Sequence, residues 1–110
     1  MTKYPREVNE VGWPRIARSV RARIGRNETD VDMWLWTQAN LPTIRAVMNT
    51  LGQPVEKAHT VMGKWGYTGA ACLPMALDDA ARNSLLRDGD LIVLTGSGAG
   101  LTMGCMALEW

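Results

Sequence analysis

The sequence predicts an α/β fold in which a mostly parallel sheet is covered by helices and ends in an antiparallel strand. Helical stripes of apolar residues alternate with short apolar runs, as in the βα units of a parallel sheet. The last two apolar runs are joined by a short glycine-rich loop, which favours antiparallel pairing because parallel strands need a long crossover. With 110 residues, 46% of them hydrophobic and 21% charged, we expect one globular domain over residues 1–110.

The first expected helix spans about residues 13–24. Its apolar residues recur at spacings of three and four: Trp13, Ile16, Val20 and Ile24. Pro14 is expected in its first turn, and Gly25 lies just beyond its end. The next apolar run, residues 31–36, is too short for an average helix and predicts a buried strand that places Thr37 at its carboxyl end.

Two further helices are expected along the middle of the chain. Asn40 can cap the second helix and Gly52 can end it, with an apolar stripe at Leu41, Ile44, Met48 and Leu51. Residues 58–62 are expected to form a second strand. A third helix follows the turn GYTGAA, with an apolar stripe at Leu73, Leu77, Ala81 and Leu85. The predicted sheet therefore has about four strands.

The C-terminal part reads as a strand over residues 91–94, a glycine-rich loop over residues 96–100 and a last strand over about residues 102–108. Glycines after a strand invite comparison with a dinucleotide-binding loop. Ten residues after the loop are too few for the helix and strand that such a site requires, so the comparison fails. The loop is either a structural hairpin or a set of backbone N–H donors for an oxyanion.

Charge and cysteine content narrow the function classes. Net charge is +1, but residues 1–26 hold seven basic side chains against two acidic ones. Such a stretch can attract an acidic protein, nucleic acid or a membrane surface, but a solvated helix face is favoured. We expect no nucleic-acid or membrane partner. Cys72 and Cys105 lack the paired spacing of a metal or redox site, and we expect free, buried thiols and no metal. No apolar run reaches the roughly 20 residues of a membrane span, and a cytoplasmic protein is expected.

Three sequence blocks, in order, resemble the β-ketoacyl-acyl carrier protein synthase III family of thiolase-fold condensing enzymes. They are TQAN at 37–40, GYTGAA at 66–71 followed by LPMALDDA, and GDLIVLTGSGAGLTMGCMALEW at 89–110. The family writes the first two as HQAN and GNTSAA. The resemblance covers about residues 30–110, is looser over 1–29, and implies the C-terminal half of the thiolase-like fold.

The resemblance also implies roles for individual residues. In the family, a His and an Asn polarise the malonyl thioester carbonyl, and Thr37 and Tyr67 occupy their positions here. Asn40 matches the Asn that lines the pantetheine tunnel, and the oxyanion loop corresponds to Gly98, Ala99 and Gly100. The family's nucleophilic Cys lies in the N-terminal half. No cofactor is implied beyond acyl-CoA or acyl carrier protein as substrate.

Other conspicuous residues have simpler explanations. His59, the only histidine, lies in an expected strand far from Thr37 in sequence, and we expect a structural or surface role. Trp34 and Trp36 alternate with Leu35 on the strand before Thr37, which favours a core or interface role over a steric plug of the tunnel.

The sequence leaves three functional hypotheses. The first is the C-terminal half of an acyltransferase, inactive alone, whose partner is an N-terminal half of the same fold or a second copy. The second is a non-catalytic subunit that binds acyl-pantetheine or a partner, and the third is acyl transfer without decarboxylation. Because apolar residues point in several directions around the third helix (Leu73, Met75, Ala76 and Leu77), a lone half is expected to expose apolar surface.

Overall fold

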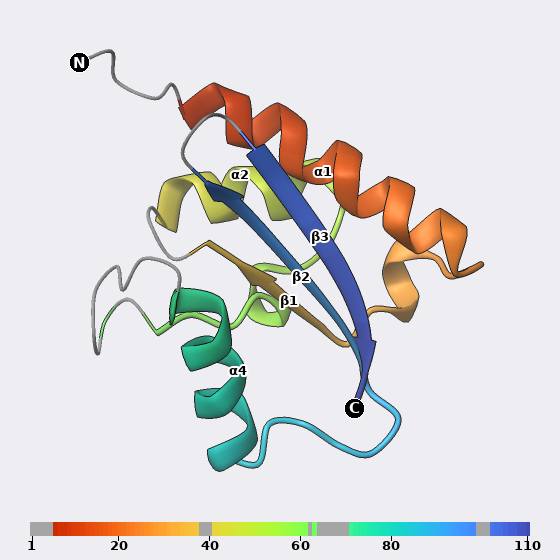
Figure 1. Cartoon of the computed structure of the whole chain (residues 1–110), viewed down its shortest axis with the longest axis vertical. Coiled ribbons are helices and arrows are strands. Elements are labelled where there is room, and N and C mark those ends of the chain that lie inside the picture. Colours follow the sequence, from red (N-terminus) through yellow and green to blue (C-terminus); the bar gives the residue numbers. More distant parts are fainter. Residues whose placement is uncertain (1–5, 38–40, 62, 64–70, 99–101) are drawn as a thin grey trace.

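The computed structural model describes residues 6–37, 41–61, 63, 71–98 and 102–110. Its main elements are helices α1 (Arg6–Arg23), α2 (Leu41–Thr50) and α4 (Cys72–Arg82), strands β1 (Met33–Trp36), β2 (Leu91–Gly98) and β3 (Thr102–Glu109), and single 3₁₀ turns at Glu28–Asp30 and Val55–Lys57. Among the described residues, the sheet has the order β1-β2-β3. Helices α1 and α2 cover one face and α4 lies on the other (Figure 1).

Strand pairing follows the predicted pattern at the C-terminus. Strand β1 is parallel to β2, with Trp36 opposite Thr95. Strand β2 is antiparallel to β3 along its whole length, with Leu91 opposite Glu109 and Gly98 opposite Thr102. The α/β fold with an antiparallel last strand is therefore confirmed.

The predicted strand at residues 58–62 is wrong. Ala58 forms an isolated parallel bridge to Trp34, and the His59 amide donates to the Trp34 carbonyl at 3.2 Å. Residues 59–61 are not part of a strand, and the His59 side chain contacts Asp79 of α4. The described sheet thus has three strands where about four were expected, while Met62 lies outside the described residues.

Helix α1 begins at Arg6, well before Trp13, so the prediction that Pro14 occupies the first turn is wrong. An internal proline removes one helical hydrogen bond, a cost of about 3 kcal/mol in an isolated helix. Packing outweighs that cost, because Trp13 is 1% exposed and Ala17 is fully buried. The end was predicted correctly: Gly25 has φ +69°, and the Arg26 amide donates to the Arg21 carbonyl.

The other two helices end by the same left-handed turn. Gly52 (φ +67°) follows α2 as expected, and the Gln53 amide donates to the Met48 carbonyl. Helix α4 ends before the predicted Leu85, because Ser84 adopts φ 58° and redirects the chain. Leu85 is 51% exposed and does not continue the buried stripe.

Alternation along the strands sorts the core into two layers. Trp34, Trp36, Leu91 and Val93 face α1 and α2. Their neighbours face α4 and pack against Ala76 and Ala80: Met33, Leu35, Ile92 and Leu94. The carboxyl ends of β1 and β2, where Thr37 and the glycine-rich segment emerge, lie at one end of the sheet between these layers.

Candidate functional site at the ends of β1 and β2

Thr37 and the start of the glycine-rich segment meet at this end of the sheet. The Thr37 amide donates to the Thr95 carbonyl at 3.1 Å, which continues the β1–β2 ladder. The Ser97 amide donates to Thr37 Oγ1 at 3.1 Å, where a longer β1 would offer a backbone carbonyl. Thr37 is 7% exposed. Its hydroxyl therefore closes the parallel ladder and joins two segments that lie 60 residues apart.

Gly96 allows this close approach. A Cβ on Gly96 would lie 3.0 Å from Thr37 Oγ1 and 3.1 Å from Leu73 Cδ1 of α4. Both distances are shorter than ordinary carbon contacts, so a side chain here would push Thr37 or α4 away. The first turn of α4 is thereby placed next to the position that the family fills with histidine.

The Ser97 side chain lies on the face of the sheet that α1 covers, opposite the α4 face, and connects the site to α1. Trp13 Nε1 donates to Ser97 Oγ at 2.7 Å, and Ser97 Oγ pairs with Asn9 Oδ1 at 2.7 Å. Trp13 also stacks on Trp36 with ring centroids 5.6 Å apart, and Trp36 stacks on Trp34 at the same distance. The core role expected for Trp34 and Trp36 is confirmed, since both are fully buried.

Several expected site residues fall outside the described residues. These are Asn40, Tyr67, Ala99 and Gly100. Of the expected oxyanion loop, the structure places Gly98 at the exposed end of β2, opposite Thr102. The structure thus brings Thr37 together with Gly96 and Ser97.

The single histidine has a structural role. His59 Nε2 lies 2.7 Å from Asp79 Oδ2, and the two side chains are 17% and 7% exposed. This contact ties the segment beside β1 to the buried face of α4. Within the described residues, no group of three or more His, Cys, Asp or Glu side chains could hold a metal ion.

The two cysteines are free thiols, as expected. Cys72 is buried at the start of α4, whereas Cys105 is half-buried on β3 and accepts a hydrogen bond from Thr95 Oγ1 at 3.2 Å. Burial raises the pKa of the Cys105 thiol, while the hydrogen bonds from Thr95 and the Met106 backbone oppose that shift. Cys105 is therefore a poor nucleophile at neutral pH, because the thiolate is the reactive form.

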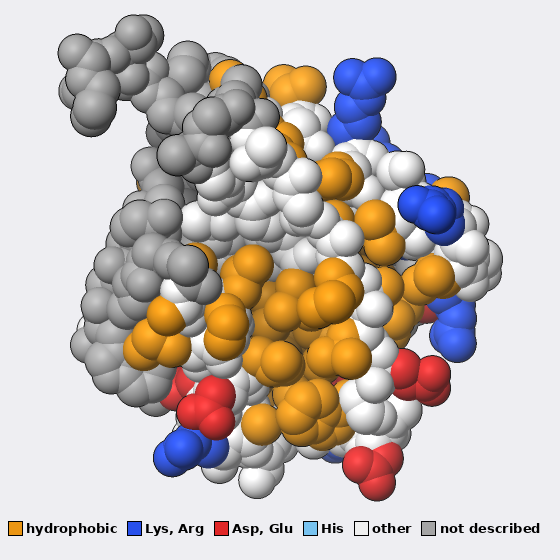
Figure 2. All heavy atoms as spheres, in the orientation of Figure 1, with side chains coloured by type: hydrophobic (Ala, Val, Ile, Leu, Met, Phe, Trp, Pro, Cys, Tyr) orange, Lys and Arg blue, Asp and Glu red, His pale blue; other side chains and the backbone are white. Residues whose placement is uncertain are grey.

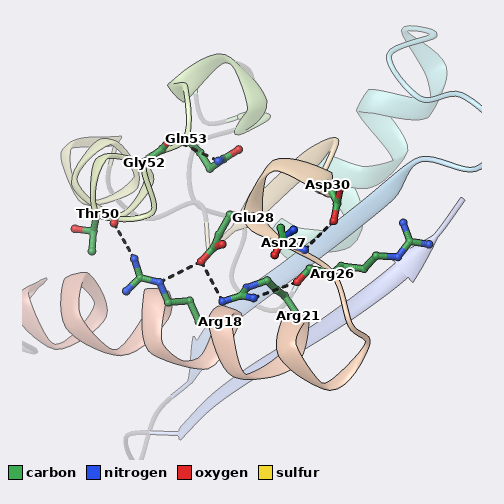
Figure 3. Close-up of polar contacts among 9 residues, drawn as sticks. All are labelled: Arg18, Arg21, Arg26, Asn27, Glu28, Asp30, Thr50, Gly52 and Gln53. Atoms are coloured by element: carbon green, nitrogen blue, oxygen red, sulfur yellow. Dashed lines mark hydrogen bonds and ion pairs between the residues drawn. The ribbon is translucent and has the colours of Figure 1, made fainter.

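Part of the basic N-terminal segment is used within the fold. Arg18 and Arg21 converge on Glu28 Oε1, each at 3.3 Å, and Arg18 also donates to the Thr50 carbonyl (Figure 3). Arg15, in contrast, is exposed and lines a groove of about 490 Å³ between α1 and the end of α2. None of the helices in the described part of the chain has the length and hydrophobicity of a membrane span.

The sheet is incompletely covered between α4 and β3. A groove of about 460 Å³ lies there, lined almost entirely by apolar atoms from Leu73, Pro74, Leu77, Leu94, Gly104, Cys105 and Met106. Met106 is 56% exposed. Figure 2 shows hydrophobic side chains gathered on this face over β2, β3 and the neighbouring side of α4. The uncovered apolar surface expected for a lone half is therefore present, although α4 itself has exposed positions such as Pro74 and Asp78.

This three-layered half, with its site at the carboxyl ends of parallel strands, has the architecture of a condensing-enzyme half of thiolase type. Residues 21–110 match the family model for the C-terminal domain of 3-oxoacyl-[acyl-carrier-protein] synthase III. The chain belongs to this family.

Individual relatives agree. A β-ketoacyl-[acyl-carrier-protein] synthase III of Halalkalibacterium halodurans is 43% identical over 94 residues, and one of Synechocystis is 39% identical over 97 residues. These matches cover 86% and 88% of this chain but 30% and 29% of the relatives, so the chain spans about a third of their length.

Solved structures give the same result. The 3-oxoacyl-(acyl carrier protein) synthase III of Pseudomonas aeruginosa superposes with a TM-score of 0.92 at 37% identity, over 96% of this chain and 33% of that one. The enzyme of Aquifex aeolicus gives 0.90 at 33% identity, over 96% and 35%. The predicted thiolase-like half is thus confirmed.

Sequence reasoning missed Asn9 and Trp13 as parts of this site. They lie four residues apart on a helix that was expected to start only at Trp13. Nothing in their local pattern indicated a contact with a residue more than 80 positions away.

Proposed function

We propose that this chain supplies the C-terminal half of a 3-oxoacyl-ACP synthase III-like acyltransferase site and is inactive without an N-terminal half. The observation that carries the proposal is the junction of Thr37 with Gly96 and Ser97 at the carboxyl ends of β1 and β2. Substrates gather at this edge of open α/β sheets. A nucleophile from the partner half would complete the site, because the described residues at this end of the sheet include no activated thiol.

The apolar groove between α4 and β3 supports an N-terminal half of the same fold as the partner. Apolar side chains on both walls would be removed from water by a second layer of helix. A second copy of this chain could cover the same surface, and self-association is the competing outcome.

The proposed acyl donor is acyl-CoA or an acyl carrier protein, with no resident cofactor. Exposed Arg15 on α1 supports an acidic carrier as donor, since opposite charges speed encounter. Asn40 and the backbone of residues 98–100 are proposed to hold pantetheine and the oxyanion by analogy with the family.

Loss of the family's His and Asn supports a second function, in which the chain binds an acyl-pantetheine or a partner without chemistry. Thr37 Oγ1 is occupied by the Ser97 amide, and a hydroxyl is not a base at neutral pH. Removing one donor from such a site costs about 3 kcal/mol of transition-state stabilisation. Acyl transfer without decarboxylation, which needs no malonyl-activating His, is the catalytic alternative.

The deciding experiment mixes this chain with the N-terminal half of the Halalkalibacterium relative and measures complex formation and acylation by acetyl-CoA. A complex that becomes acylated supports the acyltransferase, and a complex that binds coenzyme A calorimetrically without acylation supports the binding subunit. Absence of a complex contradicts the acyltransferase, and absence of both a complex and coenzyme A binding contradicts the binding subunit as well. The variant Thr37→His/Tyr67→Asn tests whether malonyl decarboxylation returns, which would show that these two positions account for its loss.

A further inference from the structure

We infer that Trp13 and Ser97 form a positioning device that fixes Thr37 from both sides. The contacts form a closed ring. Thr37 follows Trp36, Trp36 stacks on Trp13, Trp13 Nε1 donates to Ser97 Oγ, and the Ser97 amide donates to Thr37 Oγ1. Three elements take part in the ring, α1, β1 and β2. Thr37 is thereby tied to α1 through its backbone neighbour and through its own side chain.

Trp13 does more than fill the core. A buried indole N–H normally needs a hydrogen-bond partner, and the N–H of Trp13, which is 1% exposed, finds one in the Ser97 hydroxyl at 2.7 Å, near the end of β2. The same hydroxyl pairs with Asn9 Oδ1, one helical turn earlier on α1. Ser97 Oγ therefore has a donor and an acceptor on one helix, which sets both the rotamer of Ser97 and the direction of its amide.

The fixed Ser97 amide in turn orients the Thr37 hydroxyl. A hydroxyl has one hydrogen to donate and accepts through lone pairs, and one acceptor site of Thr37 Oγ1 is taken by the Ser97 N–H. The ring holds this oxygen in one orientation and leaves its hydrogen for donation. Thr37 would then serve as a donor to a ligand carbonyl oxygen, such as that of an acyl thioester. This last step rests on the proposed function, whereas the positioning of Thr37 does not.

The test uses the isolated full-length chain and NMR signals of Trp13 Nε1–H and Thr37. In Ser97→Ala, we expect hydrogen exchange at Trp13 Nε1 to rise by about tenfold, equivalent to one lost hydrogen bond, and the Thr37 signals to shift. Ser97→Thr keeps the hydroxyl and should restore both readouts. Thr95→Val is the matched control. It also removes a hydroxyl from β2, but this hydroxyl donates to Cys105 and not to a residue of α1.

Trp13→Phe provides a second route if Ser97→Ala fails to fold, since it keeps an aromatic ring and removes the N–H. Thr37 signals that stay unchanged in the folded Ser97 or Trp13 variants, or that move equally in Thr95→Val, overturn the inference. With the N-terminal half added, Ser97→Ala should lower kcat for acyl transfer about tenfold while Ser97→Thr stays near the parent. Failure of the pair to acylate contradicts the proposed function and leaves the NMR result standing.

Discussion

The two faces of the sheet differ in how completely they are covered. On the face below α1 and α2, three stacked tryptophans and the side chains of α2 are buried, with Trp34, Trp36 and Ile44 at 0% exposure. On the face beside α4, Ile92 is also fully buried, but Leu73 and Leu77 remain partly exposed along the groove. The two faces meet in β3, where exposure alternates residue by residue.

This difference separates the contacts that stabilise the folded chain from the apolar surface that is free to bind another layer. Met103, Cys105 and Ala107 of β3 pack against the α1 layer, whereas Gly104 and Met106 between them are exposed. Evenly spaced exposure is typical of an antiparallel strand with one free face, and the apolar groove beside Met106 makes that free face suitable for covering by a second layer. We therefore expect stability to reside on the α1–α2 face and association on the α4 face.

The largest expected loss of stability comes from removing the central ring of the tryptophan stack. Trp36→Ala removes a fully buried ring that stacks on both Trp13 and Trp34 and donates to Met48 Sδ. We expect the free energy of unfolding to fall by about 3–5 kcal/mol, measured by urea denaturation. Trp110→Ala is the control, because Trp110 is 43% exposed and its removal should cost little. Equal losses in the two variants would contradict a core centred on this face.

Breaking the His59–Asp79 contact should have a smaller effect. His59→Leu removes the donor to a carboxylate that is 7% exposed, and we expect a loss of about 1–3 kcal/mol in unfolding free energy. Arg82→Gln is the matched control on the same helix, since the Arg82–Asp78 pair is exposed and such pairs contribute about 0.3–0.5 kcal/mol. A loss in His59→Leu no larger than in Arg82→Gln would show that this contact does not hold α4.

The fold was largely predictable because its signals are local. Short apolar runs marked β1 and β2, and Gly25 and Gly52 marked helix ends that require positive φ. What failed depended on distant partners. The start of α1 at Arg6, ahead of Pro14, accompanies the burial of Trp13 and Ala17, and the His59 side chain contacts Asp79, 20 residues further along the chain. Thr37 was found through a family block, whereas the contact of Ser97 with α1 became visible only in the structure.

Cys105 offers a probe of the covered side of β3. Because burial raises the pKa of its thiol above the ordinary 9.0, stability that is present below pH 9 should decline as the pH rises through the folded-state value. In a Cys72→Ser background, iodoacetamide at pH 8.5 should modify Cys105 more slowly than in the urea-unfolded chain. A cysteine introduced by Met106→Cys, one residue away on the open side, should react faster. Equal rates at the two positions would contradict the difference between the faces.

The smallest expected effect on stability falls on the open face itself. Met106→Lys changes a side chain that is 56% exposed, and we expect the unfolding free energy to stay within about 0.5 kcal/mol of the parent. Association should respond far more, because a lysine in an apolar groove must lose its hydration when a second layer covers it. Sedimentation at micromolar concentration and titration with the N-terminal half measure this directly. Val11→Lys is the control, because it adds the same charge at a residue that is 70% exposed on α1, away from the groove. Two outcomes would contradict a partner surface on the open face. In the first, the parent chain stays monomeric and fails to bind the N-terminal half. In the second, both lysine substitutions weaken binding equally.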